Sequence, residues 1–157
     1  KENLFAGRCD VYTTDASGLS STRAAAADPG KWLVLPEIIS KEPLGPLVRH
    51  GDHQWGDVVR WSLNAMIIAE ELGVTSENVD AQKSSNVPEV LRLLGVEGSY
   101  GEMLELAPDW AYQIIKQIGN YSESYEANVG PDTPLEIARG LNALWTQGGI
   151  LYAPPFR

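Results

Sequence analysis

The sequence contains few of the residues on which catalytic and metal sites usually depend, with one cysteine and two histidines among 157 residues. Cys9 has no second cysteine in the sequence to pair with, which fits either a reducing compartment or a partner cysteine elsewhere. No histidine base is near it in the sequence, which argues against a cysteine nucleophile. His50 and His53 lie in one turn beside Asp52, without the further ligands that a metal site needs. The sequence therefore predicts no catalytic residue, no bound metal and no cofactor.

Basic residues and long apolar runs are also scarce. The chain carries 12 Lys and Arg against 21 Asp and Glu, a formal net charge of −9. Nucleic-acid binding needs clustered cations that neutralise phosphates, so we expect no nucleic-acid partner. No apolar run in the sequence is long enough to span a bilayer. The hydrophobic residues, 43% of the total, are enough for the core of one domain.

The first third of the sequence has an α/β character. Residues 10–15 and 31–36 have the composition of β-strands, and residues 44–49 are a candidate for a third strand. Helices are expected at residues 2–6 and in the alanine-rich stretch 17–27. Two or three strands and a helix are therefore expected before the chain becomes mainly α-helical.

From Asp52 onward the sequence predicts helices with explicit start and stop signals. The expected helices occupy residues 53–72, 87–94, 108–118 and 133–148. Asp52 and Asn86 are the expected N-caps of the first two. Glu89 follows Asn86 by three residues, and Glu136 follows Thr133 in the same way, which predicts two capping boxes.

Asp15 lies where the first expected strand stops and the next helix begins. In an α/β sheet, ligands bind at the carboxyl ends of parallel strands, beside the N-termini of the following helices. A carboxylate at that edge suits the ammonium group of a ligand, through a charge-assisted hydrogen bond. Aspartate is equally a preferred N-cap residue. The residues alone leave both interpretations open, and they favour a binding protein over an enzyme.

Four stretches of the sequence resemble a known family. They are AGRCDVYTTDASGL, LPEIISKEPLGPLVRHGDHQWGDVVRW, IGNYSESYEANVG and PLEIARGLNALWTQGGILYAPPFR. Together they resemble the general L-amino-acid periplasmic binding proteins, which are the receptors of polar-amino-acid ABC transporters in the family-3 solute-binding class. The resemblance covers essentially the whole chain.

The resemblance implies the periplasmic-binding-protein type II fold, in which two lobes close on a ligand by hinge motion. In that family the aspartate that ends the pattern GR-D-----D binds the α-amino group of the amino acid. This position is Asp15, and Thr14 beside it is the second candidate for ligand binding. The resemblance also implies a periplasmic location, a signal peptide in the precursor and a membrane permease as partner.

The same resemblance implies that the chain is the C-terminal half of such a receptor. The arginine, the aromatic residue and the G-T/S-T turn of the family's first lobe are not found in it. Residues 1–40 are then the end of lobe two, 41–74 the hinge crossing and the return helix to lobe one, and 75–157 a C-terminal helical extension packing on lobe one. We expect either the N-terminal half or a second copy of this chain as its packing partner, and a cysteine of that N-terminal half as the partner of Cys9.

The implied function is that of the substrate-binding component of an amino-acid ABC transporter, which captures L-amino acids and delivers them to the permease without chemical change. Two alternatives stay open. One is an enzyme on the same fold, similar to cyclohexadienyl dehydratases, which place a general acid in the cleft. The other is a sensory amino-acid-binding domain.

Overall fold

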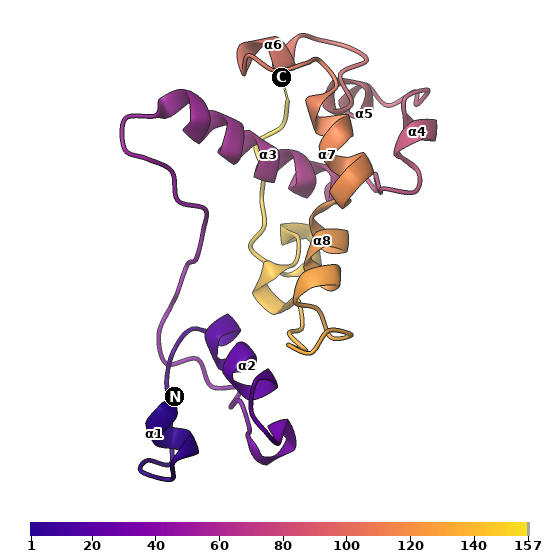
Figure 1. Ribbon diagram of the computed structural model, residues 1–157. Coiled ribbons are helices and arrows are strands. Elements are labelled where there is room, and N and C mark those ends of the chain that lie inside the picture. Colours follow the sequence, from indigo (N-terminus) through magenta and orange to yellow (C-terminus); the bar gives the residue numbers. More distant parts are fainter. Residues whose placement is uncertain (157) are drawn as a thin grey trace. The chain divides into compact units, whose positions relative to one another are not determined.

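The computed structural model describes residues 1–156, which form helices joined by irregular segments (Figure 1). They belong to two compact units. Unit 1 consists of Lys1–Gly45 and Glu126–Ala138, and unit 2 consists of Pro46–Tyr125 and the C-terminal residues from Arg139 onward. None of the helices in this described part is long and apolar enough to cross a membrane.

Unit 1 contains two α-helices and a 3-10 turn, which are α1 (Glu2–Phe5), α2 (Ala16–Ala24) and η1 (Pro29–Lys31). The ring of Phe5 meets that of Trp32 edge to face, with centroids 5.3 Å apart, which holds α1 beside the end of η1. Leu4, Ser20 and Gly130 are the buried residues of this unit. So few buried side chains do not make a hydrophobic core.

The two or three strands expected in the first fifty residues are not formed in the described part of the chain. The backbone is extended at Asp15 (φ −60°, ψ 158°) and at Trp32 (φ −116°, ψ 128°), so the local preference is present. A strand, however, needs a neighbouring strand with which to exchange backbone hydrogen bonds. Segments 10–15, 31–36 and 44–49 have no such neighbour among residues 1–156, and the α/β prediction is wrong in this detail.

Apolar side chains in these irregular segments are exposed to solvent. Leu33 and Ile39 are each 81% exposed. The other large exposed apolar side chains of the same segments in unit 1 are Val11, Leu35, Ile38 and Leu44. Strands of an α/β sheet normally bury side chains on both faces. Unit 1 therefore presents both the unpaired backbone and the bare side chains of an incomplete sheet.

Unit 2 has a core built around α3 (His53–Glu71), against which α5 (Pro88–Leu93) and α7 (Trp110–Ile118) pack. Ala65, Val74 and Ile115 are fully buried there, as Leu93 and Leu94 nearly are. The remaining α-helices are α4 (Val79–Gln82), α6 (Tyr100–Met103) and α8 (Tyr121–Asn128). The last residues of α8 belong to unit 1. Helices satisfy their own backbone hydrogen bonds, so this unit forms a core without a sheet.

The predicted start and stop of the longest helix are confirmed. The carboxylate of Asp52 accepts a hydrogen bond from the backbone N–H of Trp55 at 3.2 Å, which caps α3. Gly73 follows the end of α3 with φ +67°, a left-handed conformation that glycine adopts without strain.

The second predicted helix is present, but its predicted cap is wrong. The N-cap of α5 is Val87 and not Asn86, and no side chain caps this helix. Glu89 does not turn back to complete a capping box, because its carboxylate pairs with Arg92 at 3.3 Å. Pro108 lies before α7 instead of in its first turn.

A capping box that was not predicted from the sequence opens α8. The side chain of Asn120 accepts from the backbone N–H of Glu123 at 3.0 Å, and Glu123 accepts from the N–H of Asn120 at 2.8 Å. The Glu123 carboxylate also accepts from the backbone and the hydroxyl of Ser76. This carboxylate therefore ties α8 to the loop that follows α3.

The helix expected over residues 133–148 is not formed, and two 3-10 turns, η2 (Gly140–Asn142) and η3 (Trp145–Gln147), take its place. The hydroxyl of Thr133 accepts from the N–H of Leu135 at 3.2 Å and so caps a tight turn instead of a helix. Glu136 has φ +51°, which a right-handed helix excludes. Its carboxylate is bound to Arg23 and is not available for a capping box.

The C-terminal segment of unit 2, residues 139–156, completes the core of that unit. The ring of Phe156 stacks on Trp61 at 5.2 Å and meets Trp110 edge to face at 6.2 Å. Leu144 is 3% exposed and forms an isolated parallel β-bridge with Leu151. The segment is therefore held by side-chain burial and not by a regular helix.

Two isoleucines of α7 test this description of the core. Ile115 is fully buried, whereas Ile118 is 58% exposed, although residues three apart lie on the same side of a helix. Ile115→Ala should lower the free energy of unfolding by about 2–5 kcal/mol through lost burial and a cavity. Ile118→Ala, the matched control, should lower it by less than about 1 kcal/mol. Urea unfolding of the two variants measures the difference, and equal losses would contradict the packing.

Candidate functional site

The site is built at the N-terminus of α2, where Asp15 is the N-cap residue. Its Oδ1 atom accepts from the backbone N–H of Gly18 at 2.8 Å and from the hydroxyl of Ser17 at 2.5 Å. These two donors satisfy one end of the helix and hold the carboxylate in one orientation. The helix-cap interpretation of Asp15 is therefore confirmed.

The second carboxylate oxygen of Asp15, Oδ2, makes only a weak contact with the described residues. Among the described residues, the side-chain donor to Oδ2 is the exposed hydroxyl of Thr14, at the long distance of 3.3 Å. A Cβ atom placed on Gly18 would lie only 2.8 Å from Oδ2, so glycine keeps this side of the carboxylate open. One oxygen thus caps the helix while the other has capacity for a further donor.

The hydrogen bonds around Asp15 favour its ionised form. The Ser17 hydroxyl first, and then the Gly18 N–H, lower the pKa of the Asp15 carboxyl below its ordinary value. The positive end of the α2 dipole acts in the same direction. Asp15 is therefore a fixed negative charge at neutral pH, suited to accept from an ammonium group and unsuited to act as a general acid.

The structure brings together the two predicted ligand-binding residues, because Thr14 donates to Asp15. It also adds Ser17, which was not predicted although it follows Asp15 by two residues. Serine at that spacing from an N-cap aspartate is a local signal that sequence inspection alone can find. The Ser17 hydroxyl orients the Asp15 carboxylate and stabilises its ionised form.

The other candidates for chemistry stay apart. In the part of the chain that the structure describes, no three His, Cys, Asp or Glu side chains are placed to hold a metal ion. Asp52 is occupied as a helix cap beside His53, the first residue of α3. Cys9 is exposed and forms no disulfide within residues 1–156, so its pairing stays a prediction.

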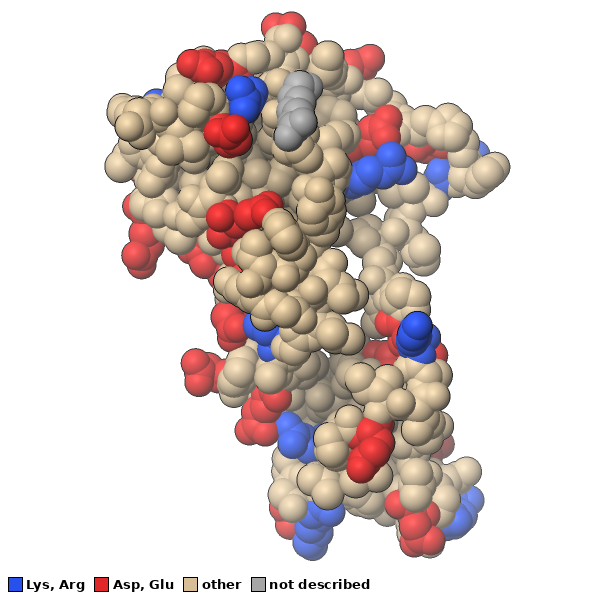
Figure 2. Space-filling model, turned by 180° about the vertical axis from the view of Figure 1, so that it is seen from behind, with Lys and Arg blue, Asp and Glu red and all other residues tan. Residues whose placement is uncertain are grey.

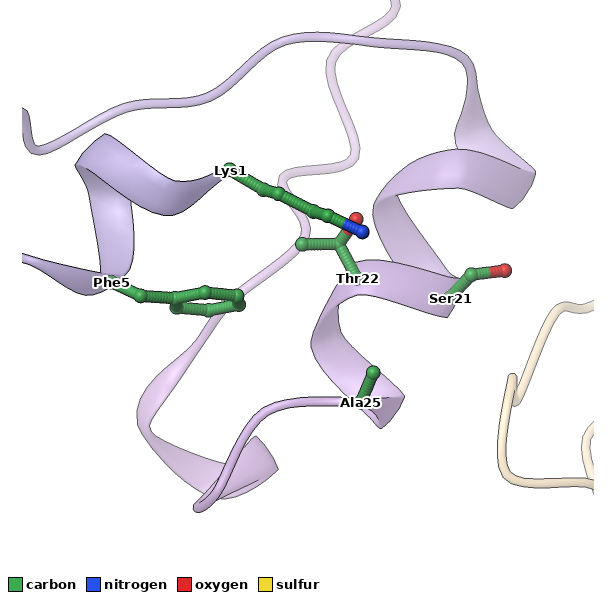
Figure 3. Close-up of a pocket in the computed structure, with 5 residues that line it drawn as sticks. All are labelled: Lys1, Phe5, Ser21, Thr22 and Ala25. Atoms are coloured by element: carbon green, nitrogen blue, oxygen red, sulfur yellow. The ribbon is translucent and has the colours of Figure 1, made fainter.

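A cavity of about 210 Å³ lies between α1 and the second half of α2 (Figure 3). It is lined by Lys1, Phe5, Ser21, Thr22 and Ala25. Neither Asp15 nor Thr14 reaches it. The cavity is thus separate from the carboxylate and supplies no anion to meet an ammonium group.

Positive and negative side chains are mixed on the face of the chain that Figure 2 shows. On the face shown in Figure 2, Lys and Arg side chains lie scattered among Asp and Glu, and no basic patch forms. The chain as a whole carries a net charge of −9, which disfavours contact with a row of phosphates.

Two curated proteins are similar to the chain along nearly its whole length, whereas no family model matches it. The glutamate/glutamine/aspartate/asparagine-binding protein BztA of Rhodobacter capsulatus is 54% identical over 158 aligned positions, which cover 100% of this chain and 47% of that protein. The general L-amino acid-binding periplasmic protein AapJ of Rhizobium johnstonii is 57% identical over 154 residues, 97% of this chain and 45% of that protein.

A solved structure is also similar to the chain. It is an ABC transporter periplasmic binding protein from Brucella ovis with glutathione bound, which is 51% identical and has a TM-score of 0.94. The match covers 99% of this chain and 49% of that one. The chain thus spans about half the length of the proteins that it matches.

The ionisation of Asp15 can be measured directly. Because its folded-state pKa is lowered, its contribution to stability is present above the pKa of the unfolded chain and is lost as the pH falls through the folded-state pKa. We expect the side-chain carboxyl carbon of Asp15 to titrate below the ordinary aspartate range in NMR experiments. Ser17→Ala should move this pKa upward, since the serine hydroxyl is the main cause of the shift. An ordinary pKa in the unsubstituted chain would contradict the hydrogen-bond arrangement.

Proposed function

We propose that this chain is the C-terminal half of an amino-acid-binding protein of an ABC transporter. The premise is its homology to such proteins, each of which it matches over about half of that protein's length. The whole protein then captures an L-amino acid in the periplasm and delivers it to a membrane permease. It performs no chemistry on its ligand. It needs no cofactor for this task.

The observation that carries the proposal is that only one of the two carboxylate oxygens of Asp15 is committed to the helix cap. Its Oδ1 is committed to the cap of α2, and its Oδ2 has capacity for a strong donor. An ammonium group supplies such a donor together with the opposite charge. In the proposed receptor the ligand's α-ammonium group binds Oδ2, with the Thr14 hydroxyl beside it.

The ligands in the names of the similar proteins share this group. BztA is named for glutamate, glutamine, aspartate and asparagine, AapJ for L-amino acids in general, and the Brucella ovis structure holds glutathione. The γ-glutamyl residue of glutathione keeps a free α-ammonium group, as every L-amino acid does. A fixed carboxylate that binds only the α-ammonium group suits a receptor that accepts amino acids with many different side chains.

The lowered pKa of Asp15 indicates that this carboxyl group is not the general acid that the enzyme alternative requires. A dehydratase of this fold needs a general acid in the cleft, and such a group must hold its proton near neutral pH. Asp15 is ionised there, because the Ser17 and Gly18 donors stabilise its charged form. The carboxylate therefore serves binding better than proton transfer.

The second part of the proposal concerns what covers unit 1. Its extended segments have unpaired backbone, and Leu33 and Ile39 are each 81% exposed. The proteins that this chain matches are about twice its length. In the proposed receptor the other half supplies the strands that pair with segments 10–15 and 31–36 and buries their side chains.

Ligand binding through Asp15 is tested with Asp15→Asn in the full-length protein. Removing the charge that faces a desolvated ammonium group should weaken the affinity for L-glutamate and L-glutamine alike, by more than about tenfold. Asp28→Asn, the same change at an exposed aspartate of unit 1, is the control and should leave both affinities unchanged. Isothermal titration measures them, and an unaltered affinity in Asp15→Asn would rule out the ligand role.

The dependence of unit 1 on the other half is tested with the isolated 157-residue chain. Exposed apolar segments and open strand edges should make this chain self-associate in solution. Addition of the separately produced other half should replace the self-association by a one-to-one complex, as seen by light scattering coupled to gel filtration. A monodisperse monomer with a sharp, cooperative thermal transition would contradict this part of the proposal.

A further inference from the structure

Residues 129–137 form a closed loop that is held by its own hydrogen bonds, and we call it the 129–137 loop. The backbone N–H of Ile137 donates to the carbonyl of Val129 at 3.0 Å and closes its base. Inside it, the hydroxyl of Thr133 donates to the carbonyl of Gly130 at 2.8 Å and accepts from the N–H of Leu135 at 3.2 Å. The loop thus has a defined shape without regular secondary structure.

The loop is bound to the last turn of α2 through one arginine, and both partners belong to unit 1. Arg23 Nη2 donates to the Glu136 carboxylate at 2.7 Å and reaches the Leu135 carbonyl at 3.5 Å. The Arg23 side chain is 24% exposed and the Glu136 side chain 61%. Unit 1 buries few side chains, and this contact ties α2 to a segment more than one hundred residues later in the sequence.

The backbone of Glu136 is strained in a way that the Arg23 contact explains. Its φ of +51° is in the left-handed region, which glycine or asparagine adopts at lower cost. Neither of those residues would place a carboxylate on Arg23. A strained residue of this kind persists where the surrounding contacts determine its conformation.

The chain on the C-terminal side of the loop is anchored in unit 2. Arg139 binds the Glu70 carboxylate with N–O distances of 3.0 and 3.1 Å, and the two side chains are only 15% and 9% exposed. Its guanidinium also lies 5.3 Å from the ring centres of both Tyr121 and Tyr125, on the helix from which the loop departs. Arg139, which follows the loop by two residues, is therefore held by residues of unit 2.

We propose that the 129–137 loop positions Asp15 through the ion pair between Glu136 and Arg23, so that Glu136 and Arg23 are positioning residues for ligand binding. Arg23 lies eight residues beyond Asp15 on α2, about 12 Å along the helix axis. The ion pair restrains the C-terminal end of α2, which is short and has few buried side chains. A restraint at that end also limits the orientation of the N-terminal end, where Asp15 lies. This inference rests on the proposed function, because the ligand meets the carboxylate at that other end.

The closing experiment compares two glutamate substitutions in the full-length protein. Glu136→Gln removes the charge and keeps the side-chain length. Glu89→Gln is the matched control, because Glu89 pairs with Arg92 at 3.3 Å and the two side chains are 55% and 28% exposed, close to the values for the loop pair. Titration with L-glutamine measures affinity, and hydrogen exchange measures the opening of the α2 amides.

We expect Glu136→Gln to weaken L-glutamine binding about two- to fivefold, the range for loss of one partly exposed ion pair. Amides of α2 should exchange faster in the same variant, and Glu89→Gln should leave both measurements unchanged. The double substitution Arg23→Glu with Glu136→Arg restores the pair in reverse and should recover slow exchange in α2.

Three results would overturn the inference in distinguishable ways. Unchanged α2 exchange in Glu136→Gln would show that the loop does not hold this helix. Faster exchange of the α2 amides with unaltered affinity would show that the Glu136–Arg23 ion pair stabilises α2 but does not affect ligand binding. Absence of binding of any of the twenty amino acids by the unsubstituted protein would overturn the proposed function and the positioning role together, while the exchange data still decide whether the loop holds α2.

Discussion

Every backbone N–H and C=O that is withdrawn from water needs a hydrogen-bond partner, and this requirement separates the two units of the chain. Unit 2 meets it with helices, which pair their own backbone groups, and so α3, α5 and α7 can bury Ala65, Leu93 and Ile115 in a common core. The extended segments of unit 1 cannot meet it alone, because a strand needs a neighbour. Leu33 and Ile39 accordingly stay in solvent, where no partner covers them.

The candidate site follows from the same requirement at the end of a helix. The first N–H groups of α2 have no partner inside the helix, and Asp15 Oδ1 satisfies that of Gly18. The two interpretations of this residue are thus compatible, since capping uses one carboxylate oxygen and leaves the other. The hydrogen bonds that cap the helix also stabilise the charge that the proposed ligand would meet.

The local capping signal at Asp52 succeeded, whereas the signals at Asn86 and Thr133 did not. Asp52 caps α3 as predicted, because the Trp55 N–H lies within hydrogen-bond reach of its carboxylate at 3.2 Å. At Thr133 the same kind of signal failed, because Arg23, more than one hundred residues earlier, takes the Glu136 carboxylate. The capping box of Asn120 and Glu123 shows the reverse case, in which a distant contact from Ser76 reinforces the local one.

The sequence by itself determined the long helix α3, its cap at Asp52, the glycine that follows its end and the position of Asp15 at the start of α2, because all of these depend on residues within one or two turns. It also determined the family resemblance, which needs only the order of residues. Tertiary structure decided which apolar side chains are buried, so that Ile115 is in the core and Ile118 is not. It likewise decided that residues 10–15 and 31–36 are not strands here and that residues 133–148 are not a helix, because pairing and long-range ion pairs depend on residues far away in the chain.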